Sequence, residues 1–380
     1  MRIAIPREAE PEPRVAATPD TVKKIKGLGA DVAIEAGAGI KSGILDSDYE
    51  AAGASVHANA AEAVSDADVV LKVRRPSAQE AALYKRGAIV VGIMDPYDNE
   101  AEIQQLAQAG VSAFAMELLP RISRAQSMDV LSSQANLAGY RAVIDAAQEY
   151  GRALPMMMTA AGTVPAAKVF IMGVGVAGLQ AIATARRLGA MVTATDVRPA
   201  TKEQVESLGA KFLAVEDEEF KNAQTAGGYA KEMSKEYQAK QAALVAEHIK
   251  KQDIVITTAL IPGRPAPQLI SKEMVASMRP GSVIIDLAIE RGGNVEGARA
   301  GEVVQEGGGV KIVGHLNMAG RLAASASALY AKNLYTLLEI LIDKASKTLA
   351  VKWDDEIVQA IALTRDGAVI HANFQPKNAA

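Results

Sequence analysis

Residues 168–178 read KVFIMGVGVAG, an apolar, strand-like run that leads into glycines at Gly173, Gly175 and Gly178. An apolar, helix-like stretch follows the glycines, and the next predicted strand ends in the acidic residue Asp196. A G-x-G-x-x-G sequence is weak evidence alone, but its position between a strand and a helix, with an acid further on, completes the dinucleotide-binding fingerprint. This stretch therefore predicts a Rossmann-type βαβ unit.

Each position of the fingerprint has a physical task. Gly173 permits a tight turn, Gly175 lets the backbone approach a pyrophosphate, and Gly178 allows the helix to pack closely on the strand. Val176 and Ala177 lie at the amino end of the predicted helix, where free N–H groups and the helix dipole attract phosphate. We therefore expect these five residues to bind the dinucleotide.

Asp196 and its neighbours predict which dinucleotide binds. Its carboxylate can accept a hydrogen bond from a ribose 2′-OH and would repel a 2′-phosphate, so NAD(H) is favoured over NADP(H). Val197 and Arg198 follow directly and belong to the same candidate pocket, although the cation of Arg198 works against this selectivity. The alternative interpretation is an ordinary βα turn in which Asp196 merely ends a strand.

Strands and helices alternate on both sides of the fingerprint. The predicted strands are residues 2–6, 31–35, 68–73, 88–93 and 112–117 in a first block, and 168–173, 191–196, 211–215, 253–259, 282–288 and 310–314 in a second. Such alternation indicates parallel sheets with helices on both faces. The sequence therefore predicts an α/β fold with two Rossmann-like, doubly wound parallel-sheet domains.

Two long helical patterns, residues 132–150 and 323–344, bracket the second block. This arrangement indicates an inserted domain. We expect residues 134–320 to form the NAD(H)-binding Rossmann domain, and residues 1–133 together with 321–380 to form a discontinuous Rossmann-like domain. The two long helices would join the domains.

Composition excludes several classes of protein. The 380 residues carry a net charge of −3, so no broad basic face predicts nucleic acid or anionic lipid as a partner. The chain has no cysteine, and its four histidines are far apart without an HExxH motif, so we expect no metal site. The longest uncharged stretch, residues 169–185, is too short for a membrane helix. We therefore expect a soluble, cytosolic chain with no direct membrane insertion.

Two polar segments are further candidates for function. Residues 121–129, RISRAQSMD, hold two arginines, a glutamine and a carboxylate between the predicted domains. Loops on a rigid scaffold often carry function, but a solvated linker would have the same composition. Residues 225–233, TAGGYAKEM, place two glycines beside Tyr229, a combination that suits a hinged lid, although composition alone favours a surface loop.

Residues 121–131, the GVGVAGLQAIATA block, TAGGYAKEM, TTALIPG and PGSVIIDLA together identify a family resemblance. In this order they are similar to the NAD(H)-binding component of proton-translocating nicotinamide nucleotide transhydrogenase, over essentially the whole chain. The wider family includes alanine dehydrogenase, which shares the two-domain architecture.

The resemblance implies a peripheral subunit that binds NAD(H) and exchanges a hydride directly with NADP(H) on a separate component. A membrane-spanning component would couple this exchange to proton movement. The family component is a homodimer, so we expect a homodimer that docks on the cytoplasmic side of the inner membrane. Direct hydride transfer depends on holding two nicotinamide rings about 3–3.5 Å apart rather than on a protein acid or base.

The resemblance also implies roles for residues in the first polar segment. Arg121, Asp129 and Ser132 match positions that orient the NAD(H) end, and Gln126 matches one that faces the NADP(H) side.

Two further segments are implied to contact the nucleotide. Gly228 and Tyr229 match the mobile loop that closes on the nucleotide, and Ala259 and Leu260 belong to the TTALIPG block.

Alanine dehydrogenase is the main alternative function. Arg14 and Lys72 match residues that bind the substrate there. However, the position of its catalytic histidine is Ile93 in this chain, and the last aspartate of its DxAxD pattern is Glu290. A third hypothesis is a non-catalytic protein that senses NAD.

Overall fold

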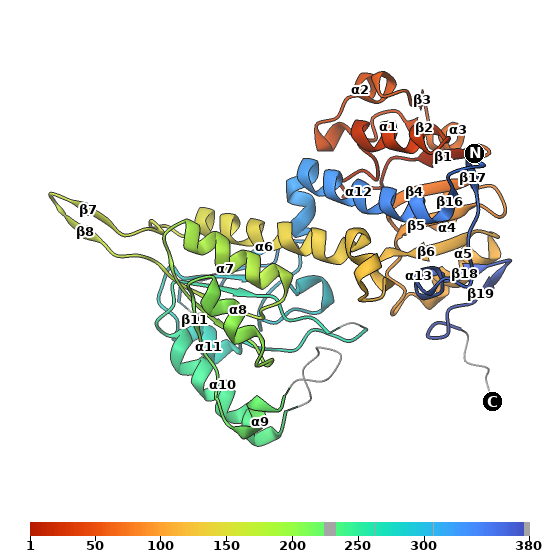
Figure 1. Cartoon of the computed structure of the whole chain (residues 1–380). Coiled ribbons are helices and arrows are strands. Elements are labelled where there is room, and N and C mark those ends of the chain that lie inside the picture. The colour runs from red at the N-terminus through yellow and green to blue at the C-terminus, as the bar shows by residue number, and fades with distance from the viewer. Residues whose placement is uncertain (224–232, 262, 307, 376–380) are drawn as a thin grey trace. The chain divides into compact units, whose positions relative to one another are not determined.

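The structure is a computed structural model that describes residues 1–223, 233–261, 263–306 and 308–375 (Figure 1). The chain divides into two compact units. Residues Met1–Gln134 and Ala319–Ala380 form the first, here the discontinuous unit, and Ala135–Met318 form the second, here the central unit.

A six-stranded parallel sheet forms the centre of the discontinuous unit, in the order β3-β2-β1-β4-β5-β6. The strands are β1 (Arg2–Ile5), β2 (Asp31–Glu35), β3 (Ser55–His57), β4 (Val69–Arg74), β5 (Ile89–Ile93) and β6 (Ser112–Ala115). The helices are α1 (Pro19–Gly27), α2 (Asp46–Ala51), α3 (Ala60–Val64), α4 (Ala78–Ala81), α5 (Glu100–Gln108), α12 (Ala323–Leu341) and α13 (Glu356–Ile361). Two short antiparallel pairs, β16–β17 (Ile342–Asp343, Thr348–Leu349) and β18–β19 (Thr364–Arg365, Ala368–Val369), complete it.

A seven-stranded sheet forms the centre of the other unit, in the order β11-β10-β9-β12-β13-β15-β14. Its strands are β9 (Lys168–Met172), β10 (Met191–Thr195), β11 (Lys211–Phe212), β12 (Ile254–Thr257), β13 (Val283–Asp286), β14 (Val303–Glu306) and β15 (Val310–Val313). The helices are α7 (Val176–Arg187), α8 (Thr201–Ser207), α9 (Glu218–Lys221), α10 (Lys235–Ile249) and α11 (Lys272–Ser277), together with the part of α6 (Val130–Glu149) that follows the unit boundary.

Both sheets follow the Rossmann strand order, in which the first strand lies between the second and the fourth. Most residues of the central strands are apolar, and Ile254, Val255 and Ile256 of β12 are at most 1% exposed. Such continuous apolar runs are typical of parallel strands with both faces covered. The prediction of an α/β fold with two Rossmann-like parallel sheets is therefore confirmed.

Local sequence explains where the elements begin. At α1, Thr18 accepts a hydrogen bond from the Thr21 amide and donates its own amide to the Thr21 hydroxyl, and Pro19 occupies the first turn. Proline suits this position because its missing N–H would have no helical partner. The longest helices are α6 and α12, close to the predicted 132–150 and 323–344.

Short edge strands and a hairpin were not predicted. β3 is a parallel edge strand of three residues, and β14 is an antiparallel edge strand that is mostly exposed. β7 (Met157–Thr159) and β8 (Gly162–Val164) form a hairpin. These strands lack the buried apolar runs on which the prediction depended. Among the residues that the structure describes, no helix combines the length and apolarity needed to cross a bilayer.

A buried carboxyl group fixes the loop after β5. Glu117 follows β6, in the 3₁₀ turn η2 (Met116–Leu118), and its Oε1 accepts the backbone N–H groups of Met94, at 2.8 Å, and Asp95. Its Oε2 is buried and has no hydrogen-bond partner among the residues that the structure describes. Burial raises the pKa of Glu117 from its usual 4.5 to about 7, more than these hydrogen bonds lower it, and the nearby charge of Asp95 adds to the rise.

Glu117→Gln should therefore change how stability depends on pH. Because the folded chain holds this proton more tightly than the unfolded chain, the contribution of Glu117 is present below about pH 4.5 and is lost as pH rises through 7. We expect the free energy of unfolding of Glu117→Gln, relative to the wild type, to rise by up to about 3 kcal/mol between pH 4.5 and 8. Urea unfolding at both pH values measures the difference, and an unchanged difference would contradict the assignment.

Candidate functional site

The fingerprint lies at the carboxyl edge of the central sheet, where the strand order reverses. Gly173 follows β9 and Thr258 follows the neighbouring strand β12. The Thr258 hydroxyl donates to the Gly173 carbonyl at 2.9 Å. Gly173 has a φ of +99°, and a Cβ on it would lie 2.5 Å from the Thr258 hydroxyl oxygen. A side chain is therefore excluded here by both conformation and space. Open α/β sheets bind ligands in this crevice.

The other two glycines have different surroundings. A Cβ on Gly178 would lie 1.9 Å from the Gly173 carbonyl oxygen, so the helix packs directly on the turn. A Cβ on Gly175 would meet no atom of the described residues within 4 Å. The space beside Gly175 is therefore open to a ligand, as a backbone that approaches a pyrophosphate requires.

Helix α7 has no side-chain cap at its amino end. Gly175 is the N-cap residue, and within the described part of the chain no side-chain cap accepts a hydrogen bond from the first turn. The first N–H groups of a helix have no partner within the helix, and they carry its positive end. Val176 and Ala177 lie at this end, so these residues fit a dinucleotide pyrophosphate.

A fourth glycine, which sequence reasoning did not identify, fixes α7 from its other side. A Cβ on Gly139 of α6 would lie 2.0 Å from the carbonyl oxygen of Ala177. The two helices therefore touch through backbone atoms at the first turn of α7. Gly139 lies inside a helical pattern, where glycine is usually unfavourable. The close backbone contact with Ala177 explains its presence, and the sequence alone does not reveal that contact.

Asp196 lies beside the fingerprint, but its carboxylate is covered. Its Oδ2 accepts the Val174 N–H at 2.7 Å, which ties the end of β10 to the glycine turn. The guanidinium of Arg198 donates to both oxygens of Asp196 at 2.9 Å, and the Asp196 side chain is only 7% exposed. A ribose hydroxyl would therefore share this carboxylate with Arg198 or displace it.

Apolar side chains surround this edge of the sheet. Val176, Val197 and Leu260 follow three adjacent strands and are 41%, 43% and 52% exposed. Ala259 is partly exposed beside them. Apolar lining with a few polar groups is typical of cofactor sites. Gly228 and Tyr229 lie outside the described residues.

The polar segment at 121–129 is built into the discontinuous unit. Residues Ser123–Met128 form the 3₁₀ helix η3, whose Ala125 and Met128 are buried in the core. Asn333 of α12 donates to the Ser127 carbonyl at 2.9 Å, and Arg124 donates to Asp355 at 2.6 Å. The segment is therefore anchored rather than a solvated linker.

The residues predicted in this segment differ in exposure. Arg121 and Gln126 are exposed, whereas Asp129 and Ser132 are half-buried. Asp129 accepts hydrogen bonds from the amide of Ser132, at 2.9 Å, and from its hydroxyl, at the start of α6. This pair caps the helix, so Asp129 and Ser132 already have a structural role.

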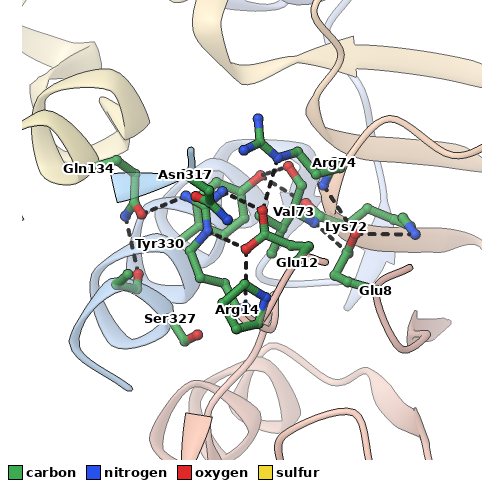
Figure 2. A network of polar contacts seen from close by, with 12 residues as sticks. Glu8, Glu12, Arg14, Lys72, Val73, Arg74, Gln134, Asn317, Ser327 and Tyr330 are labelled. Carbon is green, nitrogen blue, oxygen red and sulfur yellow. Dashed lines mark hydrogen bonds and ion pairs between the residues drawn. The ribbon is translucent and has the colours of Figure 1, made fainter. Parts of the chain in front are cut away.

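Arg14 and Lys72 lie in a buried polar network (Figure 2). Arg14 donates twice to Glu12 at 2.7 Å and once to Gln134 at 2.8 Å. Desolvation opposes ionisation of Glu12, but Arg14 and Arg74 outweigh it and lower the pKa of that carboxyl to about 2. The Arg14 side chain is only 3% exposed, so its cation is neutralised inside the unit.

Lys72 has its own two carboxylate partners. Its Nζ lies 2.6 Å from Glu80 and 3.3 Å from Glu8, and the side chain is 1% exposed. These carboxylates outweigh desolvation and raise the pKa of Lys72, which keeps it charged. Tyr330 donates to the Lys72 carbonyl at 2.8 Å, which links β4 to α12.

The two positions that differ from alanine dehydrogenase have ordinary surroundings. Ile93 is the half-buried last residue of β5, and its aliphatic side chain can neither donate nor accept a proton. Glu290 lies in the short helix η4 (Ile289–Arg291), is exposed, and accepts the Asn317 N–H at 2.7 Å.

Gly175→Ala and Gly178→Ala should separate binding from folding. Gly175→Ala adds a methyl group in open space, so stability should change by no more than about 1 kcal/mol. If the pyrophosphate approaches here, NADH affinity should fall about tenfold or more through lost charge-assisted hydrogen bonds. Gly178→Ala forces the helix off the turn and should cost about 3 kcal/mol or more. Urea unfolding and NADH fluorescence titration measure both quantities. Unchanged NADH affinity in Gly175→Ala would contradict this placement.

Comparisons with known proteins agree with this architecture. Residues 4–138 match the family described as "Alanine dehydrogenase/PNT, N-terminal domain", and residues 142–372 match its C-terminal domain. The chain is 58% identical to an NAD(P) transhydrogenase alpha-subunit chain of Rhodospirillum rubrum, over 98% of each chain.

Solved structures give the same result. A transhydrogenase from Sinorhizobium meliloti matches with a TM-score of 0.89 at 65% identity, over 97% of this chain and 100% of that one. An L-alanine dehydrogenase matches with a TM-score of 0.83 at 25% identity, over 98% of each chain. The chain therefore belongs to the alanine dehydrogenase/PNT family. Within this family, its sequence identity is high to the transhydrogenase alpha subunits.

Proposed function

We propose that this chain is the NAD(H)-binding subunit of a proton-translocating transhydrogenase. The observation that carries the proposal is the uncapped amino end of α7, which opens beside Gly175 at the switch point of the central sheet. NAD(H) bound there would supply or accept a hydride. The chain itself would bind the pyrophosphate with backbone N–H groups and hold the nicotinamide in a fixed orientation.

The anchored segment supplies the orienting residues in this proposal. Arg121, Asp129 and Ser132 orient the NAD(H) end, and Gln126 faces NADP(H) on the partner component. Rigid support favours this role, because hydride transfer depends on near-attack geometry. The buried Ala125 and Met128 and the hydrogen bond from Asn333 provide that support. Tyr229 completes the proposal as a residue that closes on the nucleotide.

Selectivity for NAD(H) over NADP(H) belongs to the same proposal. Asp196 places a carboxylate beside the fingerprint, and its Oδ2 is held there by the Val174 N–H. Arg198 is paired with this carboxylate, which offsets the attraction of its cation for a 2′-phosphate.

Alanine dehydrogenase is the second candidate function, and it is supported only by the match of Arg14 and Lys72 to substrate-binding positions of that enzyme. Both residues are paired with carboxylates in this chain, and Ile93 stands where that enzyme has its catalytic histidine. Formation of an imine from a keto acid and ammonia requires proton transfers to and from the substrate, and the Ile93 side chain has no group that can make them. These features favour direct transfer between nucleotides.

We further propose that the subunit works as a homodimer on the cytoplasmic side of the inner membrane, bound to a membrane-spanning component. The β7–β8 hairpin supports the homodimer, because it projects from the rest of the central unit (Figure 1). Met156, Met157 and Met158 are 58%, 43% and 78% exposed. Adjacent exposed apolar side chains on a projecting hairpin are typical of an interface.

Reconstitution with the NADP(H)-binding and membrane components of a transhydrogenase tests the activity. We expect hydride exchange between NADH and an NADP⁺ analogue, and no NADH oxidation when pyruvate and ammonium are added to the chain alone. Gln126→Ala should lower the exchange rate about tenfold without changing NADH affinity, because Gln126 faces the other nucleotide.

Ser123→Ala, on the same 3₁₀ helix, is the matched control and should leave the exchange rate unchanged. NADH binding without exchange in the complete mixture would refute the transhydrogenase proposal. Steady NADH oxidation with pyruvate and ammonium would instead establish alanine dehydrogenase.

Replacing Met157 and Met158 by lysine tests the homodimer. Two charges per copy on the hairpin should prevent its burial, so the double variant should sediment as a monomer while the wild type sediments as a dimer. Met191→Lys, at a methionine that is 55% exposed elsewhere in the central unit, should leave the dimer intact. A dimeric double variant would exclude the hairpin from the interface.

A further inference from the structure

One buried amide, Asn294, pairs with the backbone that follows β12. Its Oδ1 accepts the Ala259 N–H at 3.0 Å, and its Nδ2 donates to the Ala259 carbonyl at 2.9 Å. These two bonds are those that a neighbouring strand would form with Ala259. The second proton of Nδ2 donates to the Pro267 carbonyl at 2.8 Å. A single side chain therefore holds both ends of the loop between Ala259 and Pro267.

Asn294 is itself fixed from the next strand. It is 0% exposed, and its backbone N–H donates to Asp286 Oδ2 at 2.8 Å. Asp286, the last residue of β13, also accepts the N–H groups of Ala288 and Val295. Gly293 has a φ of +83°, and a Cβ on it would lie 2.7 Å from Asp286 Oδ2. The Asp286 carboxylate therefore holds the turn that presents Asn294.

The backbone that Asn294 holds is in contact with the fingerprint. Thr258, one residue before Ala259, donates to the Gly173 carbonyl, and a Cβ on Gly173 would lie 3.3 Å from the Ala259 nitrogen. A shift of Ala259 would therefore displace the turn on which Gly178 and α7 pack. A site whose backbone is ordered before the ligand arrives loses less free energy on binding.

We propose that Asn294 is a positioning residue for the dinucleotide site, which it holds in its binding geometry by pairing with Ala259 and Pro267. Asn294 acts through the backbone of Thr258 and Ala259 rather than by touching the nucleotide. The proposal rests on the proposed function, because it assumes that NAD(H) binds at the fingerprint.

Asn294→Asp tests the role with the smallest change of shape. An ionised carboxylate would turn an oxygen toward the carbonyls of Ala259 and Pro267, where the amide donates two hydrogen bonds. We expect the Kd for NADH, measured by fluorescence titration at pH 8, to rise at least fivefold while the number of sites per chain stays that of the wild type. Asn294→Ser, which is uncharged and too short to reach either carbonyl, should give the same result if the aspartate variant does not fold.

Thr364→Val is the matched control for lost stability. Thr364 is 0% exposed in the discontinuous unit, where its hydroxyl donates to the Val111 carbonyl and accepts the Ala113 N–H. This variant removes a comparable buried clamp and should leave the Kd for NADH unchanged. A rise of less than fivefold in the Asn294 variants, or an equal rise in Thr364→Val, would overturn the proposal.

Hydrogen exchange of the wild-type chain gives a second readout that needs no variant. The Ala259 amide proton should exchange slowly before NADH is added, because the Asn294 side chain already accepts a hydrogen bond from it. Rapid exchange without NADH, with protection only after binding, would overturn the positioning role. If the wild-type chain binds no NADH at all, the proposed function itself fails, and the two failures are thereby distinguished.

Discussion

The contact between Gly178 and the Gly173 carbonyl is the constraint on which the central unit depends. Only the absence of a Cβ lets α7 begin directly against the turn that ends β9. On its other side, the same helix turn is in close backbone contact with Gly139 of α6. Because two backbone contacts fix the first turn, its N–H groups hold one direction without a side-chain cap. The chain thus leaves a rigid, electropositive opening where a folded helix would ordinarily be capped.

Neighbouring strands extend this constraint along the sheet edge. Val174 binds Asp196 after β10, Gly173 binds Thr258 after β12, and Asp286 fixes the turn after β13. Charge in the discontinuous unit is arranged differently, because Arg14 and Lys72 are neutralised by buried glutamates. The central unit therefore offers N–H groups at the start of α7 that no side-chain cap of the described residues accepts. The discontinuous unit instead pairs the buried cations Arg14 and Lys72 with its own carboxylates. This contrast agrees with nucleotide binding and disfavours a carboxylate substrate at Arg14.

The sequence predicts features that depend on local spacing. Glycine spacing after an apolar strand predicts the turn at Gly173, and alternating strand and helix patterns predict both parallel sheets. Contacts between distant residues were not predictable. The pairing of Asn294 with Ala259 and the contact of the buried Glu117 carboxyl with the loop after β5 each depend on which segments meet in space. Periodicity likewise misses the β7–β8 hairpin, because its strands are short and largely exposed.

A crystal structure of the chain with NADH bound would test the central claim most directly. The account predicts pyrophosphate oxygens within hydrogen-bond distance of the N–H groups of Val176 and Ala177, with a ribose hydroxyl at the Asp196 carboxylate and Arg198 displaced or sharing it. NADH bound elsewhere, with the amino end of α7 facing only solvent, would contradict the account.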